Sequence, residues 1–246
     1  MKKLILIQND FAGTGKTTLA RAIARYLTQN GVGHQSLVLS EDEAAAHRAQ
    51  RWVDPSNLNA HLFGLGDAAF GITILEAGNG YGKQFAEHYA RNEIADVLHE
   101  FGVELTVVIA INEDEDSREG VVDAAETYSD GARYVIARVH PDGDDSDEAV
   151  AAWKRSYAAR VMDMFEAAEL EIPAAGAQID SLLRARGTDL ADSLLEDDPC
   201  AAYGPDYRAW LERVVRSIDG AREDLFGDGA PDFSPPKKGA SRVPVE

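Results

Sequence analysis

The residues best suited to chemistry stand together near the N-terminus. Gly13 and Gly15 are followed directly by Lys16 and Thr17. Glycines let successive backbone N–H groups curl around phosphate oxygens at the start of a helix, whose dipole also favours an anion. A lysine at this position reaches the β- and γ-phosphates of a nucleotide, and the hydroxyl that follows binds Mg²⁺. The predicted nucleotide-binding residues are Ala12, Gly13, Thr14, Gly15, Lys16, Thr17 and Thr18.

This loop lies between a predicted strand and a predicted helix. Residues 3–8 form a continuous apolar run, as expected for a strand buried on both faces, and residues 17–29 repeat apolar side chains at helical spacing. Further strands are expected at residues 36–39, 71–75, 105–111, 134–139 and 170–172, and helices at residues 83–101, 117–128, 148–168, 178–185, 189–195 and 206–226. The alternation predicts an α/β fold, a three-layer α-β-α sandwich with a mostly parallel central sheet, of the P-loop NTPase class.

The charge of the chain limits its partners. Its 246 residues include 24 Lys+Arg and 43 Asp+Glu, which gives a formal net charge of −19. Such a charge opposes binding to phosphate backbones and anionic membranes, so we expect direct DNA contact to be weak or to pass through an adaptor. A solvated helix face is the simpler interpretation of the one basic cluster suited to DNA. That cluster comprises Arg184, Arg186, Arg213, Arg216 and Arg222.

The sequence also predicts a soluble, cytoplasmic protein. Its longest run without a charge, residues 26–40, has 15 residues, whereas a membrane span needs roughly 20 apolar ones. The single cysteine, Cys200, excludes an internal disulfide and fits a reducing compartment. We expect one nucleotide-binding domain over residues 1–226 and a disordered tail over residues 227–246, which holds four of the nine prolines.

The loop resembles the deviant Walker A motif of the ParA/MinD family of dimerising ATPases. In that family the motif is K-G-G-x-G-K-T-T, and residues 11–18 of this chain are F-A-G-T-G-K-T-T. The resemblance covers residues 3 to about 175. It implies ATP and Mg²⁺ as cofactors, a nucleotide-dependent homodimer, and a partner or adaptor protein. It also implies a role in plasmid partition, plasmid stability or cargo positioning.

Two later segments supply further site residues through the same resemblance. Residues 37–42 resemble the family's second strand, which ends in D-x-D, and Asp42 matches the Asp that positions the attacking water. Residues 74–80 resemble the switch strand and turn D-x-P-x-G, with Glu76 in the position of Asp. The implied catalytic residues are Lys16 and Asp42, and the implied Mg²⁺ ligands are Thr17 and Glu76. Without the resemblance, Asp42 equally fits an acid at a helix N-terminus, and Glu76 fits a turn cap.

The sequence departs from these patterns at three positions. Asp10 replaces the first glycine of G-x-x-x-x-G-K-[ST], and Ser40 replaces the first Asp of D-x-D. Phe11 replaces the lysine that reaches across the dimer in the family. Because an aromatic side chain donates no cationic hydrogen bond, we expect any dimer to be weaker than is usual in the family, or to use an apolar contact through Phe11.

Two other functions remain open at this stage. A small P-loop kinase or an ATP-dependent ligase acting on a metabolite uses the same kind of loop. Such kinases usually carry an arginine-rich lid, whereas residues 47–51 are a brief basic segment and the later loops are acidic. The third hypothesis is a nucleotide-binding scaffold that no longer hydrolyses ATP, which the residues Phe11 and Ser40 suggest.

Overall fold

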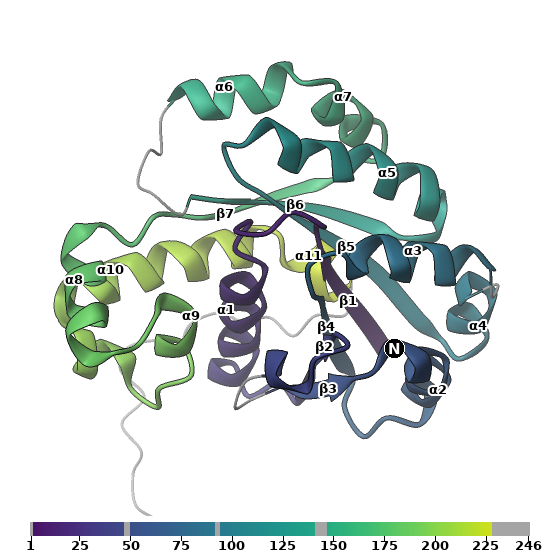
Figure 1. Cartoon of the computed structure of the whole chain (residues 1–246), viewed down its shortest axis with the longest axis horizontal. Coiled ribbons are helices and arrows are strands. Elements are labelled where there is room, and N and C mark those ends of the chain that lie inside the picture. Colours follow the sequence, from purple (N-terminus) through teal and green to yellow (C-terminus); the bar gives the residue numbers. More distant parts are fainter. Residues whose placement is uncertain (1, 47–49, 92–93, 141–146, 228–246) are drawn as a thin grey trace, which may run out of the picture.

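The computed structural model describes residues 2–46, 50–91, 94–140 and 147–227, and its centre is one parallel β-sheet (Figure 1). Every paired strand runs parallel to its neighbour, in the order β3-β2-β4-β1-β5-β6-β7. The strands are β1 (Lys2–Gln8), β2 (His34–Leu39), β3 (Arg51–Val53), β4 (Ile72–Ala77), β5 (Val103–Ile111), β6 (Arg133–Val139) and β7 (Ala168–Ile172).

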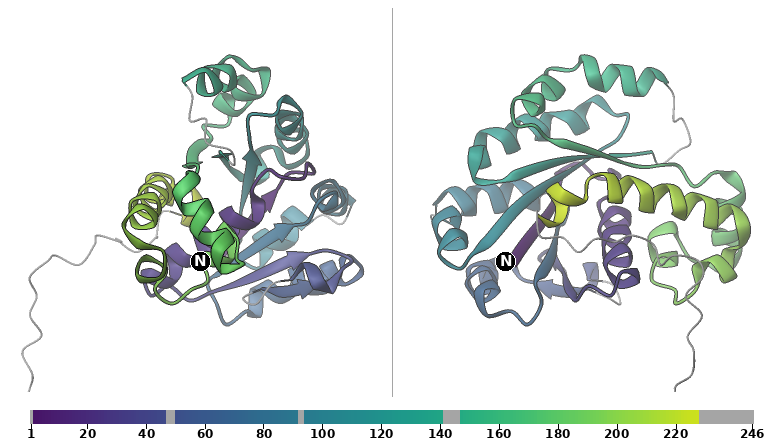
Figure 2. Two further views of the ribbon diagram at one scale, coloured as in Figure 1. Left: turned by 60° about the vertical axis from the view of Figure 1, so that its left-hand side comes forward. Right: turned by 180° about the vertical axis from the view of Figure 1, so that it is seen from behind.

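Helices cover both faces of the sheet and complete three layers. The helices are α1 (Lys16–Gln29), α2 (Leu58–Gly64), α3 (Tyr81–Arg91), α4 (Ile94–Glu100), α5 (Glu119–Tyr128), α6 (Asp147–Arg155), α7 (Tyr157–Met164), α8 (Ala177–Arg186), α9 (Leu190–Ser193), α10 (Pro199–Gly220) and α11 (Arg222–Phe226). Figure 2 shows helices on both sides of the sheet. In β1, Leu4 and Leu6 belong to the hydrophobic cluster formed with α2 to α7, whereas Ile5 and Ile7 belong to the cluster formed with α1 and α8 to α11. The predicted α/β sandwich is therefore confirmed.

The path of the chain brings distant loops to one edge of the sheet. From the central strand β1, α1 leads outward to β2 over one face, and α3 and α4 lead from β4 across to β5 over the other. The chain then continues outward through β6 and β7. The carboxyl ends of β1, β4 and β5 consequently meet where the direction of winding reverses, which is where open α/β sheets bind ligands.

Several boundaries differ from the sequence-based expectation. The single helix expected over residues 83–101 is two, α3 and α4, and the one expected over residues 148–168 is α6, α7 and the start of β7. The Ser156 hydroxyl accepts from the backbone N–H of Ala159 at 3.0 Å and begins α7 as a new helix. The helix expected over residues 206–226 corresponds to the second part of α10, which follows the non-helical Gly204 and ends at Gly220, and to the separate α11. The strand β3 and helix α2 were not predicted.

The last described helix joins the core of the domain. The ring of Phe226 stacks on Tyr26 of α1, with centroids 5.7 Å apart. Most of the predicted tail, residues 228–246, lies outside the described residues. Among the helices of the described ranges, none combines the length and the apolar character that crossing a bilayer requires.

Candidate functional site

The loop between β1 and α1 has the backbone of a phosphate-binding turn. Gly13 and Gly15 both have a φ of 76°, a left-handed conformation that glycine adopts without strain. Gly15 is also packed against β6, because a Cβ at this position would lie 2.4 Å from Cγ1 of Val139. Helix α1 begins at Lys16, directly after this turn, so the free N–H groups of its first turn face the loop. This combination suits a bound phosphate.

Lys16 is buried beneath the loop. Its Nζ donates to the carbonyl oxygen of Phe11 at 2.8 Å and to Oδ1 of Asn79 at 3.0 Å. The residue is only 6% exposed. Burial lowers the pKa of Lys16 from its usual value, and the negative charges of Glu76 and Asp10 oppose that shift. Both acceptors are neutral oxygens, which the phosphate oxygens of a nucleotide can replace.

The two residues predicted to bind Mg²⁺ are in contact. The Thr17 hydroxyl donates to Oε1 of Glu76 at 2.5 Å, and Nε2 of Gln50 donates to Oε2 of the same carboxylate at 2.7 Å. Glu76 lies near the end of β4, which pairs with β1, and is 5% exposed. A hydroxyl and a carboxylate are the oxygen ligands that Mg²⁺ prefers, with water and phosphate completing its coordination. The residues present therefore fit this ion.

A metal at this position depends on the nucleotide as well as on the protein. Within the described residues, no group of three or more His, Cys, Asp or Glu side chains is arranged to hold a metal ion. Thr17 and Glu76 supply two ligands. The remaining positions around Mg²⁺ are left to phosphate and water oxygens.

Asp42 lies in an exposed turn, and no hydrogen bond or ion pair joins it to the loop in the described part of the chain. Its Oδ1 accepts from the N–H of Ala44 at 2.9 Å, so it caps the short 3₁₀ helix Glu43–Ala45. The segment is held to the start of α3, since the Glu41 N–H donates to the Tyr81 hydroxyl at 3.1 Å. The water-positioning role that the resemblance implies for Asp42 therefore requires this segment to move.

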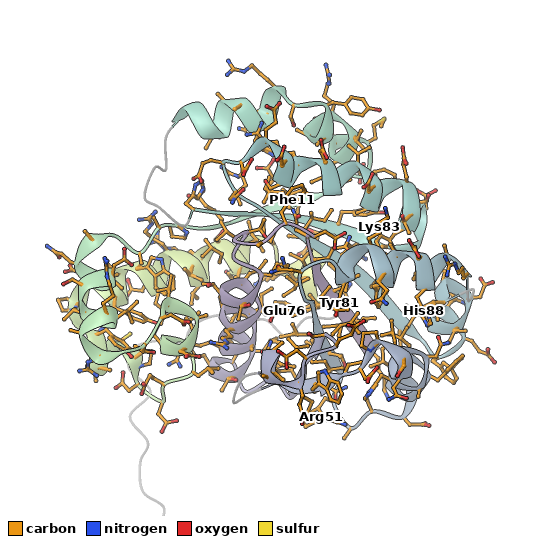
Figure 3. The ribbon with its side chains drawn as sticks, in the orientation of Figure 1. Phe11, Arg51, Glu76, Tyr81, Lys83 and His88 are labelled. Carbon is orange, nitrogen blue, oxygen red and sulfur yellow. The ribbon has the colours of Figure 1, made fainter. Side chains whose placement is uncertain are left out.

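Asp10 explains why the loop lacks its usual first glycine. Its Oδ1 accepts from the backbone N–H of Gly82 at 2.8 Å, and its Oδ2 accepts from that of Lys83 at 3.1 Å. Both N–H groups belong to the first turn of α3. Figure 3 labels Tyr81 and Lys83 of this turn. A Cβ on Gly82 would lie 2.8 Å from Oδ1 of Asp10, so the close approach requires glycine. The loop thus supplies the N-terminal cap of a helix 70 residues away.

Asn9 anchors the other side of the loop. Its Nδ2 donates to the carbonyl oxygens of Ala110, within β5, at 2.8 Å and of Ser117, after β5, at 2.7 Å. Its Oδ1 accepts from the Phe11 N–H at 3.0 Å. Sequence analysis missed Asn9, Asn79 and the capping role of Asp10. Their only sequence signal is a run of short polar side chains directly after an apolar strand.

The remaining predicted residues occupy two regions. Ala12 and Gly13 are exposed at the tip of the loop, Thr14 is buried, and Phe11 and Thr18 are half-buried. The predicted arginine cluster lies on α8, α10 and α11, which cover the same face of the sheet as α1. Its members make local contacts: Arg184 donates to the Asp180 carbonyl oxygen at 3.3 Å and Arg216 to the Glu212 carbonyl oxygen at 3.2 Å. Arg222 pairs with Asp219 at 3.9 Å, and Arg186 lies over the ring of Tyr203.

Comparison with known proteins supports the fold of this chain and shows neither its family nor its function. No protein-family model and no curated protein matches the chain. The solved structure of the MinD cell division protein from Aquifex aeolicus matches with a TM-score of 0.50 and 15% identity, over 88% of this chain and 97% of that one. The MinC:MinD cell division protein complex of the same organism matches with a TM-score of 0.49 and 14% identity, over 88% and 96%. The chain therefore has the parallel α/β fold of the P-loop NTPase MinD.

Proposed function

We propose that this protein is a Mg²⁺-dependent ATP-binding and ATP-hydrolysing switch of ParA/MinD type. The observation that carries the proposal is the junction of three elements at one point: a glycine turn at the start of α1, the buried Lys16 behind it, and the Thr17–Glu76 pair across the β1–β4 boundary. This set offers backbone donors and a cation to phosphate, and hard oxygen ligands to Mg²⁺.

The residues divide the work of nucleotide binding between them. Backbone N–H groups of residues 12–18 hold the phosphates, and Lys16 exchanges its neutral acceptors for the β- and γ-phosphate oxygens. Thr17 and Glu76 hold Mg²⁺, which neutralises charge on the phosphates when bound. Hydrolysis further requires a group that places water in line with the γ-phosphate, and we assign that role to Asp42.

The contacts of Lys16 support a switch rather than a passive site. Asn79 precedes α3, and its Oδ1 is an acceptor for Lys16. When Lys16 turns to phosphate, the turn at Asn79 loses this contact. Because Tyr81 follows two residues later and holds the N–H of Glu41, a change at Asn79 is passed to the segment that carries Asp42. Nucleotide binding and the position of Asp42 are coupled in this way.

The same proposal includes a cellular role and the partners of the switch. We assign the switch to plasmid or DNA partition, plasmid stability or cargo positioning, through a partner or adaptor protein. A nucleotide-dependent homodimer uses the surface around Phe11, which offers an apolar contact in place of a cation. The net charge of −19 keeps direct DNA binding weak.

The test is a titration of the full chain with ATP and with GTP in the presence of Mg²⁺, followed by phosphate release with and without DNA. We expect tight ATP binding and slow turnover. The variant Lys16→Ala should lose Mg·ATP binding while keeping its fold, because it removes the charge that faces the phosphates. Unchanged affinity in a folded variant would reject the loop assignment. Binding without any turnover would favour a scaffold, and turnover only with an added metabolite would favour a kinase or ligase.

A further inference from the structure

Gln50 joins the carboxylate of the proposed Mg²⁺ site to the edge of the sheet. It directly precedes β3, and its Nε2 donates to Oε2 of Glu76 on β4 at 2.7 Å. Strand β2 lies between β3 and β4, so this hydrogen bond reaches across a whole strand. The other oxygen of the carboxylate, Oε1, accepts from the Thr17 hydroxyl. Both oxygens of the buried Glu76 side chain therefore have donors, and Gln50 is one of them.

The other end of the Gln50 amide has no partner. Its Oε1 is buried and accepts no hydrogen bond in the described part of the chain. The amide cannot turn round, because an ionised carboxylate only accepts hydrogen bonds and must face the N–H end. A buried carbonyl oxygen without a donor costs free energy. A bound molecule that donates a hydrogen bond beside Glu76 would remove this cost.

The neighbours of Gln50 indicate which molecule this is. Thr17 and Glu76 offer two oxygen atoms to Mg²⁺, an ion that keeps several water molecules when few protein groups bind it. A divalent cation withdraws charge from its bound water, which becomes a better hydrogen-bond donor. The unpaired oxygen belongs to the same amide that holds Glu76. It is therefore suited to accept from such a water.

We propose that Gln50 is a positioning residue of the metal site: its Nε2 orients Glu76, and its Oε1 accepts a hydrogen bond from a water molecule bound to Mg²⁺. Outer partners of this kind fix the orientation of metal ligands and strengthen metal binding. The inference rests on the proposed function and adds to it a residue that the phosphate-loop motif does not contain. Asp42 has to move to reach the site, whereas Gln50 already contacts it.

Gln50 also connects the metal site to the segment that carries Asp42. Trp52, two positions after Gln50, donates from Nε1 to the Ser40 carbonyl oxygen at 2.6 Å. The Ser40 hydroxyl in turn accepts from the Asp42 N–H at 3.1 Å. A change in the position of Gln50 is thus passed through β3 to Ser40 and Asp42.

The experiment measures ATP binding to the full chain by calorimetry, in EDTA and over a series of Mg²⁺ concentrations. We expect Gln50→Met to require at least about tenfold more Mg²⁺ than the wild type, as expected when a metal ligand loses its outer partner. Its affinity for ATP in EDTA should stay within about twofold of the wild type, because the hydrogen bond of Gln50 is to Glu76 and not to the phosphate loop. Thermal unfolding checks that each variant folds.

The matched control is Gln35→Met. Gln35 donates from Nε2 to Oγ1 of Thr73 at 2.8 Å, so it also joins an amide to a side chain of β4, but near the start of that strand. Both variants lose one contact to β4 and should unfold at a lower temperature. Gln35→Met should keep the Mg²⁺ dependence of the wild type. If the two variants show the same Mg²⁺ dependence, Gln50 only holds β3 to the sheet and the proposal is overturned.

The variant Gln50→Glu separates the two ends of the amide. It keeps an oxygen acceptor, removes the N–H that faces Glu76 and places a second carboxylate beside it. Because like charges repel, we expect it to unfold at a lower temperature without Mg²⁺, and to need no more Mg²⁺ than the wild type for ATP binding. A Mg²⁺ requirement as high as that of Gln50→Met would overturn the role of Oε1.

The wild type separates failure of this inference from failure of the proposed function. If the wild type binds no ATP, or binds it equally well in EDTA and in Mg²⁺, the proposed Mg·ATP site is wrong and the role of Gln50 is rejected with it. If the wild type binds ATP in a Mg²⁺-dependent way that Gln50→Met leaves unchanged, the role of Gln50 alone is rejected.

Discussion

Asp10 and Gly82 are in contact, and this contact determines the effect of Gly82→Ala on the free energy of unfolding. We expect the substitution to destabilise the protein when Asp10 is present and to stabilise it when residue 10 is alanine. Replacing glycine by alanine inside a helix normally stabilises a protein by roughly 0.5–1 kcal/mol. Here the new Cβ would lie 2.8 Å from Oδ1 of Asp10, which is the free end of a short side chain. The carboxylate will rotate away and lose its hydrogen bonds to the Gly82 and Lys83 N–H groups.

The two effects of Gly82→Ala therefore oppose each other. Loss of an N-terminal cap costs about 1–2 kcal/mol, which exceeds the usual gain from alanine. We expect Gly82→Ala to lower the free energy of unfolding by up to about 1.5 kcal/mol in the wild type. In the background Asp10→Ala the cap is already absent, so the same change should raise that free energy by roughly 0.5–1 kcal/mol.

A double-mutant cycle measured by urea unfolding tests this reasoning. The four proteins are the wild type, the two single variants and the double variant, and their midpoints are compared at equal slope. The coupling between positions 10 and 82 should be about 1–2 kcal/mol. If Gly82→Ala stabilises both backgrounds equally, Asp10 does not cap α3 and the argument fails.

Two further predictions concern the nucleotide site, and a third concerns DNA binding. Asp42→Ala should bind ATP normally but hydrolyse it slowly and accumulate in the ATP state; light scattering with ATP and with ADP tests for a dimer, and one mass in both states at micromolar concentrations would reject a dimer switch. Glu76→Gln should require at least about tenfold more Mg²⁺ for ATP binding, because an amide is a weaker ligand than a carboxylate; an unchanged Mg²⁺ dependence would remove Glu76 from the metal site. DNA binding should be weak at about 150 mM salt, and strong binding that survives loss of Arg213, Arg216 and Arg222 would contradict this.

The main strands could be predicted because the strands of a parallel sheet are covered by helices on both faces. Each main strand is buried on both faces, so the sequence shows a continuous apolar run, as in residues 3–8 and 105–111. The strand β3 was missed because it has three residues and only Val53 is fully buried. The breaks within the two expected helices 83–101 and 148–168 were missed, because the apolar periodicity continues across each break. In the second, only the cap residue Ser156 marks the start of the new helix.

The site was predictable only in its local part. The glycine turn, Lys16 and Thr17 are contiguous, so their spacing alone indicates a phosphate loop. The partners Asn79, Gln50 and Gly82 lie 26 to 72 positions from the residues they contact, and no sequence period joins them. The metal and catalytic roles of Thr17, Glu76, Lys16 and Asp42 stay predictions.

The packing of Gly15 against Val139 has a consequence for how the protein is made. The phosphate loop leaves the ribosome well before the strand that supports Gly15, because Val139 is about 120 residues further along the chain. At roughly 10 residues per second, translation of that interval takes on the order of 10 s. Until this interval ends, the nascent chain carries the complete loop sequence without the whole of β6, the strand against which Gly15 packs. The loop sequence is thus synthesised well before the strand that completes its binding site.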